Sequence, residues 1–372
     1  MIYTEILDSD KLLLKNNTCA IKTKIIVKPR NESEEEIVLT EDNSVKDWTY
    51  DDDRLVPDQG FIGQFVARTL TGNLQDINED FNIEDRELEL RLAIVSLGEN
   101  PTEKLYTLGT FYVTKPESND VSDNTKFESL DKTILFNADF NYNYVSTNFP
   151  SSFATLCETN VGITAINLAK YVCEQVGVIF GTTSFVNDDF LISSNQFVSG
   201  DSCRDVMKAI AQLAYSWVYI DWDDKCYIPT IEKDTTVVTD IDTMDSDEYF
   251  TLTLQKTNYG PVNKVSVGLS TVDGERIENT DTTSIQQHGE TEIDIFDNPI
   301  TYNTSLRSQA IEGSDILFGI EFTPLDVETI GHPWVKGYKL ICVDDTSGDK
   351  KYTLPLNNKI KYTGHIRSVI SS

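Results

Sequence analysis

Residues 202–228 read SCRDVMKAIAQLAYSWVYIDWDDKCYI, and this stretch decides the local fold in the middle of the chain. Ser202, followed three residues later by Asp205, is an acidic form of the capping box that begins a helix. After Trp217 the side chains alternate between two faces, and Asp223 and Asp224 make a turn before the next short strand. Behind the cap, apolar residues keep helical spacing at Val206, Ile210, Leu213, Ala214 and Trp217. The stretch therefore predicts a helix followed by a β-hairpin.

A second helix is predicted upstream of this stretch. Thr164 is a suitable N-terminal cap, and Gly177 supplies a C-terminal stop. Between them, one apolar stripe has the spacing of a helix face: Ala165, Ile166, Ala169, Val172, Cys173 and Val176. Together with the helix and hairpin of residues 202–228, this pattern predicts a small α/β domain over residues 126–235.

Strand patterns dominate on both sides of that domain. Alternating apolar and polar residues before it predict a first β-barrel-like domain over residues 1–116, followed by a polar linker at Glu117–Thr125. The clearest alternation there is at Cys19–Lys28, Leu88–Leu97 and Leu105–Val113. A second β-barrel-like domain, with one short helix at Leu306–Gly313, is predicted over residues 249–372. Its expected strands are Leu252–Leu254, Val262–Leu269, Glu290–Phe296, Leu340–Val343 and Lys359–Val369.

The predicted fold class is therefore mainly β with α+β, in which two barrel-like β domains flank a small α/β domain. The chain has 372 residues, 39% hydrophobic and 25% charged, which is typical of a globular protein rather than a disordered one. No apolar run approaches the roughly 20 residues that a membrane span needs, so no membrane segment is expected. Met1–Glu5 shows no signal-peptide pattern, and we expect synthesis and folding in a cytoplasm.

The net charge of the chain argues against one class of function, which is nucleic-acid binding. The formal net charge is −30, and such a surface repels phosphates, which argues against specific nucleic-acid binding by a basic face. For most acidic runs, plain solubility is the simplest explanation. If the protein forms a ring, an acidic lumen is a second explanation, because it lets DNA pass without binding it.

The search for catalytic chemistry finds no HExxH, GxSxG or GxxxxGK[ST] motif. Six cysteines show no CxxC spacing, and the three histidines, His288, His332 and His365, lie far apart in the sequence. A Cys226–His288 hydrolase pair is the alternative, but Cys226 lies in a predicted strand rather than at a helix N-terminus that lowers a thiol pKa. We predict that the chain is not an enzyme, with no catalytic, cofactor-binding or metal-binding residues and no cofactor.

Two further clusters have competing interpretations. Four carboxylates are the best metal candidate, but they lack the central Gly and terminal Glu of an EF-hand loop, so an acidic surface loop is preferred over a calcium site: Asp240, Asp242, Asp245 and Asp247. Five aromatic residues crowd an Asn-rich stretch and are suited either to stacking on sugars or to packing as one strand face: Phe136, Phe140, Tyr142, Tyr144 and Phe149. Packing is favoured.

The order of several segments resembles one protein class. They are Lys126–Lys132, the aromatic stretch 136–149, Cys173–Val178, Phe185–Ile192, the helix and hairpin of 202–228, Tyr259–Val265 and Asp297–Pro299. In this order they resemble the baseplate hub proteins of bacteriophage and prophage tails. That family of minor structural tail proteins includes the structural N-terminal region of tail-associated lysins. The resemblance runs from about Phe127 to the C-terminus.

The resemblance implies a structural virion tail protein that forms a homotrimer, with six barrels in a pseudo-sixfold ring. Such a hub joins the tail tube to the tip or spike of a phage tail or phage-like injection particle. It forms a channel for DNA or cargo during ejection. The implied partners are a distal tail or tube protein and a tip, spike or tape-measure protein, assembled in the host cytoplasm. Because the chain stops at Ser372, the cell-wall hydrolase of longer relatives is not carried over. The alternative is a tail-associated hydrolase or receptor-binding protein with an unrecognised site.

Overall fold

The computed structural model describes most of the chain. The description leaves out residues 1, 4–5, 16–18, 31–33, 43, 54–61, 76–82, 98–100, 120–123, 194–195, 198–199, 232–241, 247, 255–259, 271–274, 321–324, 330–333, 336–340, 345–346, 348–349, 354–356, 363–365 and 372. Within the described part, no helix is long and apolar enough to cross a membrane.

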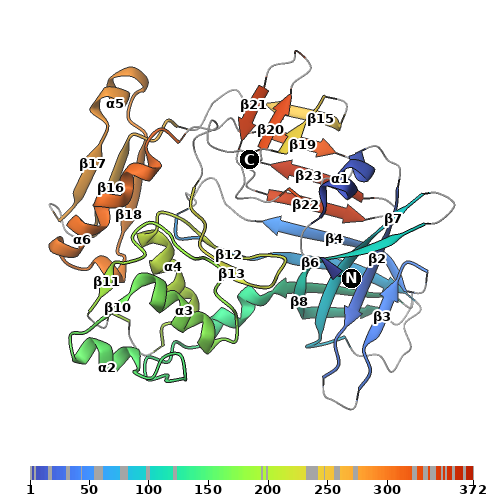
Figure 1. Cartoon of the computed structure of the whole chain (residues 1–372), viewed down its shortest axis with the longest axis horizontal. Helices are drawn as coiled ribbons and strands as arrows, with labels where there is room; N and C mark the ends of the chain where they lie inside the picture. Colours follow the sequence, from blue (N-terminus) through green and yellow to red (C-terminus); the bar gives the residue numbers. More distant parts are fainter. Residues whose placement is uncertain are drawn as a thin grey trace.

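A twelve-stranded sheet dominates the molecule (Figure 1). Its strands are, in spatial order, β15 (Tyr249–Leu254), β19 (Leu325–Thr329), β23 (Ile366–Ser371), β22 (Asn357–Tyr362), β4 (Val45–Asp53), β6 (Thr69–Gln75), β9 (Asn124–Asp131), β8 (Glu103–Asn119), β7 (Glu87–Ser96), β2 (Cys19–Val27) and β3 (Ile37–Thr40), with β1 (Ile2–Tyr3) pairing with β8. The strands predicted at β2, β7 and β8 are confirmed, but burial alternates clearly only in β7, since residues 106–111 of β8 are all buried. In β7, buried and half-buried residues alternate from Glu87 to Leu92.

Strands from the two ends of the chain meet in this sheet. β22 runs antiparallel to β4, in a register that extends from Asn357 opposite Asp53 to Tyr362 opposite Trp48. The rings of Trp48 and Tyr362 stack with centroids 5.7 Å apart, and both are buried. The two strand-rich regions of the sequence therefore share one large sheet and its hydrophobic core.

Several predictions for these regions need correction. The mainly β, α+β class is confirmed, but barrel-like domains are not, because none of the described sheets closes. The predicted linker Glu117–Thr125 is wrong: β8 continues to Asn119 and pairs with β9, with Asn119 opposite Asn124. The predicted single strand Lys359–Val369 is two strands, β22 and β23. Polar residues in a strand resemble a linker in sequence, because no apolar alternation marks them.

The middle of the chain forms an α/β unit with its own core. It contains α2 (Phe153–Glu158), α3 (Ala165–Gln175), α4 (Cys203–Leu213), the strand pair β10 (Ile163–Thr164) and β11 (Leu191–Ile192), and the hairpin β12 (Val218–Ile220) and β13 (Cys226–Tyr227). The predicted capping box is confirmed, since the Ser202 hydroxyl accepts from the Asp205 amide and the Asp205 side chain accepts from the Ser202 amide. The hairpin and its turn are confirmed as well, with Asp224 in the left-handed region at φ 60°.

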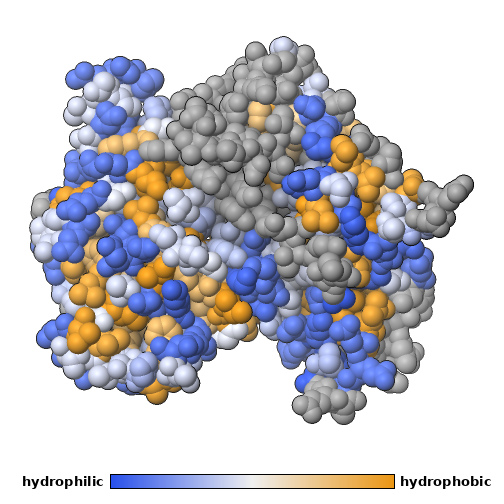
Figure 2. All heavy atoms as spheres, viewed as in Figure 1, coloured by the Kyte–Doolittle hydropathy of each residue, from blue (hydrophilic) through white to orange (hydrophobic). Residues whose placement is uncertain are grey.

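A third unit follows, built on the sheet β17 (Ile277–Thr280), β16 (Lys264–Gly268) and β18 (Glu292–Phe296). The predicted helix is present as α6 (Thr304–Ile311), but α5 (Thr282–His288) and, at the N-terminus, α1 (Asp8–Lys15) were not predicted. α5 has no buried residue, and Figure 2 shows hydrophilic atoms over it. An apolar stripe is the sequence pattern that predicts a helix, and α5 has no such stripe. A small sheet of β14 (Asp242–Met244), β20 (Ile341–Asp344) and β21 (Lys350–Thr353) completes the fold.

The α/β unit is attached to the large sheet by a buried ion pair and a shared strand. β5 (Phe65–Val66) runs parallel to β12, so a strand from the N-terminal region extends the hairpin. Three residues later, the buried Arg68 donates from Nε to Asp131 Oδ2 at 3.0 Å. Its other nitrogens donate to the carbonyls of Leu108 at 3.1 Å and Asp221 at 3.0 Å. One guanidinium thus ties β8, β9 and the end of β12 together. The domain limits 1–116, 126–235 and 249–372 stay a prediction.

Candidate functional site

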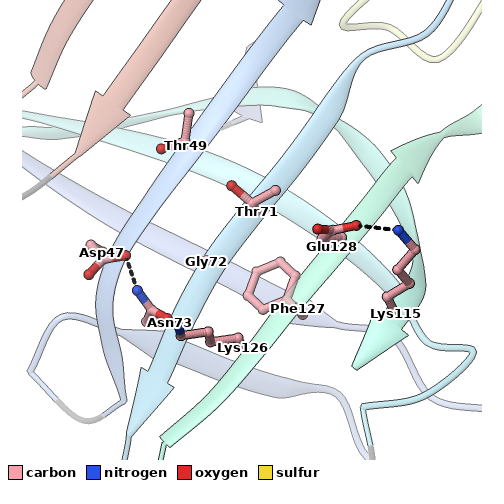
Figure 3. Close-up of a pocket in the computed structure, with 9 residues that line it drawn as sticks. All are labelled: Asp47, Thr49, Thr71, Gly72, Asn73, Lys115, Lys126, Phe127 and Glu128. Atoms are coloured by element: carbon pink, nitrogen blue, oxygen red, sulfur yellow. Dashed lines mark hydrogen bonds and ion pairs between the residues drawn. The ribbon is translucent and has the colours of Figure 1, made fainter. Parts of the chain in front are cut away.

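The solvent-facing side of the large sheet presents a row of short polar side chains over β4, β6, β9 and β8. We call this surface the polar face and define it by Asp47, Thr49, Thr71, Asn73, Lys115, Lys126 and Glu128 (Figure 3). Alternation along each strand explains it, since the neighbouring residues Trp48, Tyr50 and Phe127 are buried in the core. A hollow of about 380 Å³ lies in this face, with Gly72 at its floor.

At Gly72 a side chain would point into the core, on the side of the sheet opposite the hollow. A Cβ there would lie 2.8 Å from the ring of Phe127, which sits directly opposite on β9. The ring therefore occupies the space that a side chain on β6 would take. Register shifts in β4, between Val45 and Asp47, and in β8, between Val113 and Lys115, flank the hollow.

Charges on the polar face are paired across strands. Asn73 Nδ2 donates to Asp47 Oδ1 at 2.6 Å, and Lys115 Nζ lies 3.1 Å from Glu128 Oε2 (Figure 3). On the adjacent strand β22, Lys359 pairs with Asp51, and Lys361 is exposed opposite Thr49. Among the described side chains on this side of β22, β4, β6, β9 and β8, lysines and carboxylates are therefore nearly balanced. That balance contrasts with the charge of −30 for the whole chain.

Five described carboxyl groups have a shifted pKa, and hydrogen bonds or ion pairs favour the ionised form of each. Burial raises the pKa of Glu89, but hydrogen bonds and ion pairs with Arg91 and Lys28 outweigh it and lower that pKa to about 2. Among the described carboxyl groups with a shifted pKa, the other four are also shifted downward: Glu34, Glu174, Asp205 and Asp297. A general acid at neutral pH needs the opposite shift.

The structure does not bring the alternative hydrolase pair together. Cys226 is buried in β13, in the core of the α/β unit, whereas His288 is exposed at the end of α5 in the third unit (Figure 1). Cys226 lies beside Cys173, and burial raises the pKa of the Cys173 thiol well above its ordinary value. His332 and His365 lie outside the described residues.

The structure describes only part of the acidic cluster predicted at residues 240–247. Asp240 and Asp247 lie outside the described residues, and Asp242 is described only as part of β14. Within the described part of the chain, no three His, Cys, Asp or Glu side chains gather as a set of metal ligands. The preference for a surface loop over a calcium site therefore stays a prediction.

The aromatic stretch packs as predicted, although it is not a strand. Phe136 and Phe140 are buried, and the Phe140 ring lies 5.7 Å from Phe153 and 6.1 Å from Tyr171, both in edge-to-face geometry. The backbone of this segment forms turns between Asn137 and Ser152, because its hydrogen bonds go to α3 and to nearby side chains rather than to a neighbouring strand. Tyr144 and Phe149 are half-buried and stay beside the surface.

Comparison with known proteins finds solved structures of similar fold. No family model and no curated protein matches the sequence. The chain is similar in structure to the tail protein from Neisseria meningitidis, with a TM-score of 0.58 and 9% identity over 95% of this chain and 96% of that one. It is also similar to a 43 kDa tail protein of prophage MuSo2 from Shewanella oneidensis (TM-score 0.54, 14% identity, 94% and 97% covered). A prophage tail protein from Listeria monocytogenes gives a TM-score of 0.51 at 10% identity, with 94% of each chain covered. The predicted resemblance to phage tail proteins is thus confirmed in the fold: nearly the whole chain adopts the fold of these solved tail proteins.

Proposed function

We propose that this protein is the structural hub of a phage tail tip or phage-like injection particle. In this proposal three copies form a ring that joins the tail tube to the tip or spike and encloses a channel for DNA or cargo. One observation carries the proposal: three solved tail proteins share the fold over at least 94% of this chain and of their own. The partners are then other tail proteins, in a virion tail assembled in the host cytoplasm.

We assign the channel wall to the polar face. Duplex DNA carries about one charge per 1.7 Å of axis, so a basic wall binds it and slows its passage. Lys115 on the polar face pairs with Glu128, and Lys359 on the adjacent strand β22 pairs with Asp51, which reduces the attraction of both lysines for phosphate. A wall of this kind meets the same physical requirement as the acidic lumen predicted from the net charge of −30.

The oligomeric state tests the hub. Multi-angle light scattering on the purified chain, alone and mixed with its neighbouring tail proteins, is expected to give a homotrimer in at least one condition. A chain that stays monomeric with those proteins present contradicts the proposal. Purified protein is also expected to leave a peptidoglycan gel intact, whereas clearing of the gel supports the alternative of a tail-associated hydrolase.

Charge reversal tests the channel wall. Replacing Asp47 and Glu128 by Lys leaves the polar face basic without disturbing the core, because both side chains reach solvent. Particles that carry this variant are expected to assemble normally and to eject DNA more slowly, with the defect easing as salt rises. The matched control reverses Glu278 and Asp294 on the third unit. Ejection at the normal rate in the Asp47 and Glu128 variant refutes the assignment of this face.

A further inference from the structure

A second hollow, of about 440 Å³, lies at the C-terminal end of α3 and shares no lining residue with the polar face. It is open to solvent between α3 and the turn-rich loop at residues 144–149. Figure 2 shows hydrophobic atoms reaching the surface over the unit that carries α2, α3 and α4. The volume falls within the range of about 300–1,000 Å³ that small-molecule sites occupy. We call this hollow the α3 groove.

One side of the α3 groove is apolar and held in place by the core. Phe149 packs edge-on against the buried Tyr171, with ring centroids 5.3 Å apart, and Phe180 packs in the same way against Phe185 at 6.5 Å. Between them Ile179 is 65% exposed. A wall of this kind presents flat apolar surface without the conformational freedom of a mobile loop.

The rest of the lining is polar and held by hydrogen bonds. Glu174 Oε2 accepts from Asn148 Nδ2 at 2.9 Å, and Oε1 accepts from the Tyr144 hydroxyl at 3.3 Å. Hydrogen bonds from Ser146 and Asn148 lower the pKa of Glu174, so its carboxylate is ionised at neutral pH. A carboxylate has about four acceptor positions, and these three donors leave one for a ligand.

Lys170 adds a donor to the same groove. It lies one helical turn before Glu174 on α3, and both residues line the hollow. The groove therefore combines an ammonium donor, an oriented carboxylate acceptor and an apolar wall. Lys170 and Glu174 carry opposite charges that offset each other, so the lining favours a ligand without net charge. Such a ligand carries hydroxyl groups, which both donate and accept hydrogen bonds. It also has a face of C–H groups that contacts Phe149 and Ile179.

We propose that the α3 groove binds a neutral sugar. A pyranose has hydroxyl groups at its edge and apolar C–H groups on its face, which match the polar and the apolar parts of the lining. Binding of one ring at a shallow site is expected with Kd on the order of 1 mM. The site is independent of the proposed hub function, because none of its residues belongs to the polar face.

Saturation-transfer NMR on the full chain tests this site, with glucose, galactose and N-acetylglucosamine as probes. We expect at least one of the three to receive saturation from the wild-type protein. Glu174→Gln removes the charge from the acceptor and is expected to weaken binding about tenfold. Ile179→Arg fills the groove and is expected to abolish binding, while its exposed position leaves the fold intact.

Glu158→Gln is the matched control, because Glu158 is an exposed carboxylate at the end of α2 and is not among the residues that line the α3 groove. It is expected to bind like the wild type. Absence of transfer to all three sugars overturns the proposal. Equal transfer in the wild type, Glu174→Gln and Ile179→Arg overturns it as well, since the sugar then binds elsewhere. Neither outcome bears on trimer formation, so the two proposals fail separately.

Discussion

Replacing Arg68 by Met tests how the α/β unit is joined to the large sheet. The substitution removes a fully buried guanidinium and its donations to Asp131 and to the carbonyls of Leu108 and Asp221. Breaking a buried ion pair by removing one partner costs about 3–5 kcal/mol, because the other charge stays buried without compensation. Asp131 keeps its hydrogen bonds from the amide of residue 68 and from Thr133, so we expect the lower end, about 3 kcal/mol.

Urea denaturation, followed by fluorescence of the tryptophans, measures this loss. The matched control is Lys115→Met, which breaks the exposed pair with Glu128 and is expected to cost less than about 1 kcal/mol. The double variant with Asp131→Asn removes both charges but keeps an acceptor for Thr133, and it is expected to recover part of the stability lost in Arg68→Met. A loss under about 1 kcal/mol for Arg68→Met, equal to the control, refutes the reasoning.

Three further predictions concern the sheet, a helix and the pH dependence of stability. Gly72→Ala places a Cβ 2.8 Å from the Phe127 ring and is expected to cost about 1–3 kcal/mol in thermal unfolding; an unchanged midpoint contradicts this. Ser202→Ala removes the capping box with Asp205 and is expected to cost about 1 kcal/mol, whereas Ser202→Asp keeps most of that stability. Because the pKa of Glu89 is lowered from 4.5 to about 2, its contribution is present above pH 4.5 and is lost as pH falls toward 2. Glu89→Gln is expected to flatten that part of the curve of unfolding free energy against pH, and an unchanged slope excludes Glu89 as its source.

Local patterns predicted the middle of the chain well. The capping box at Ser202 and the turn at Asp224 both depend on residues within four positions of each other, so the sequence alone contains their full cause. The packing of Phe140 was also predictable, because aromatic side chains lose water wherever a core is within reach. The backbone conformation around Phe140 was not predictable, since alternation over a few residues occurs in turns as well as in strands.

Neither candidate site could be found from sequence motifs. The polar face takes Thr49, Thr71 and Glu128 from three strands, and each residue alone is an ordinary polar position on a strand. Among the residues that line the α3 groove, Phe149 belongs to the aromatic stretch recognised in the sequence, but no sequence pattern marks Glu174 as a site residue. Its partners Tyr144 and Asn148 are 30 and 26 residues away, and only folding brings them to one carboxylate.

Local sequence patterns were enough to predict the mainly β composition with a helical middle, and the order of segments resembles that of phage tail hub proteins. These properties follow from side-chain periodicity and local hydrogen bonds, which act over a few residues. The pairing of β22 with β4, from Asn357 opposite Asp53 to Tyr362 opposite Trp48, and the single sheet shared by the two strand-rich regions became visible only in the folded structure. Strand pairing depends on backbone hydrogen bonds, which any residue except proline can make, so the sequence carries little information about which distant edges join.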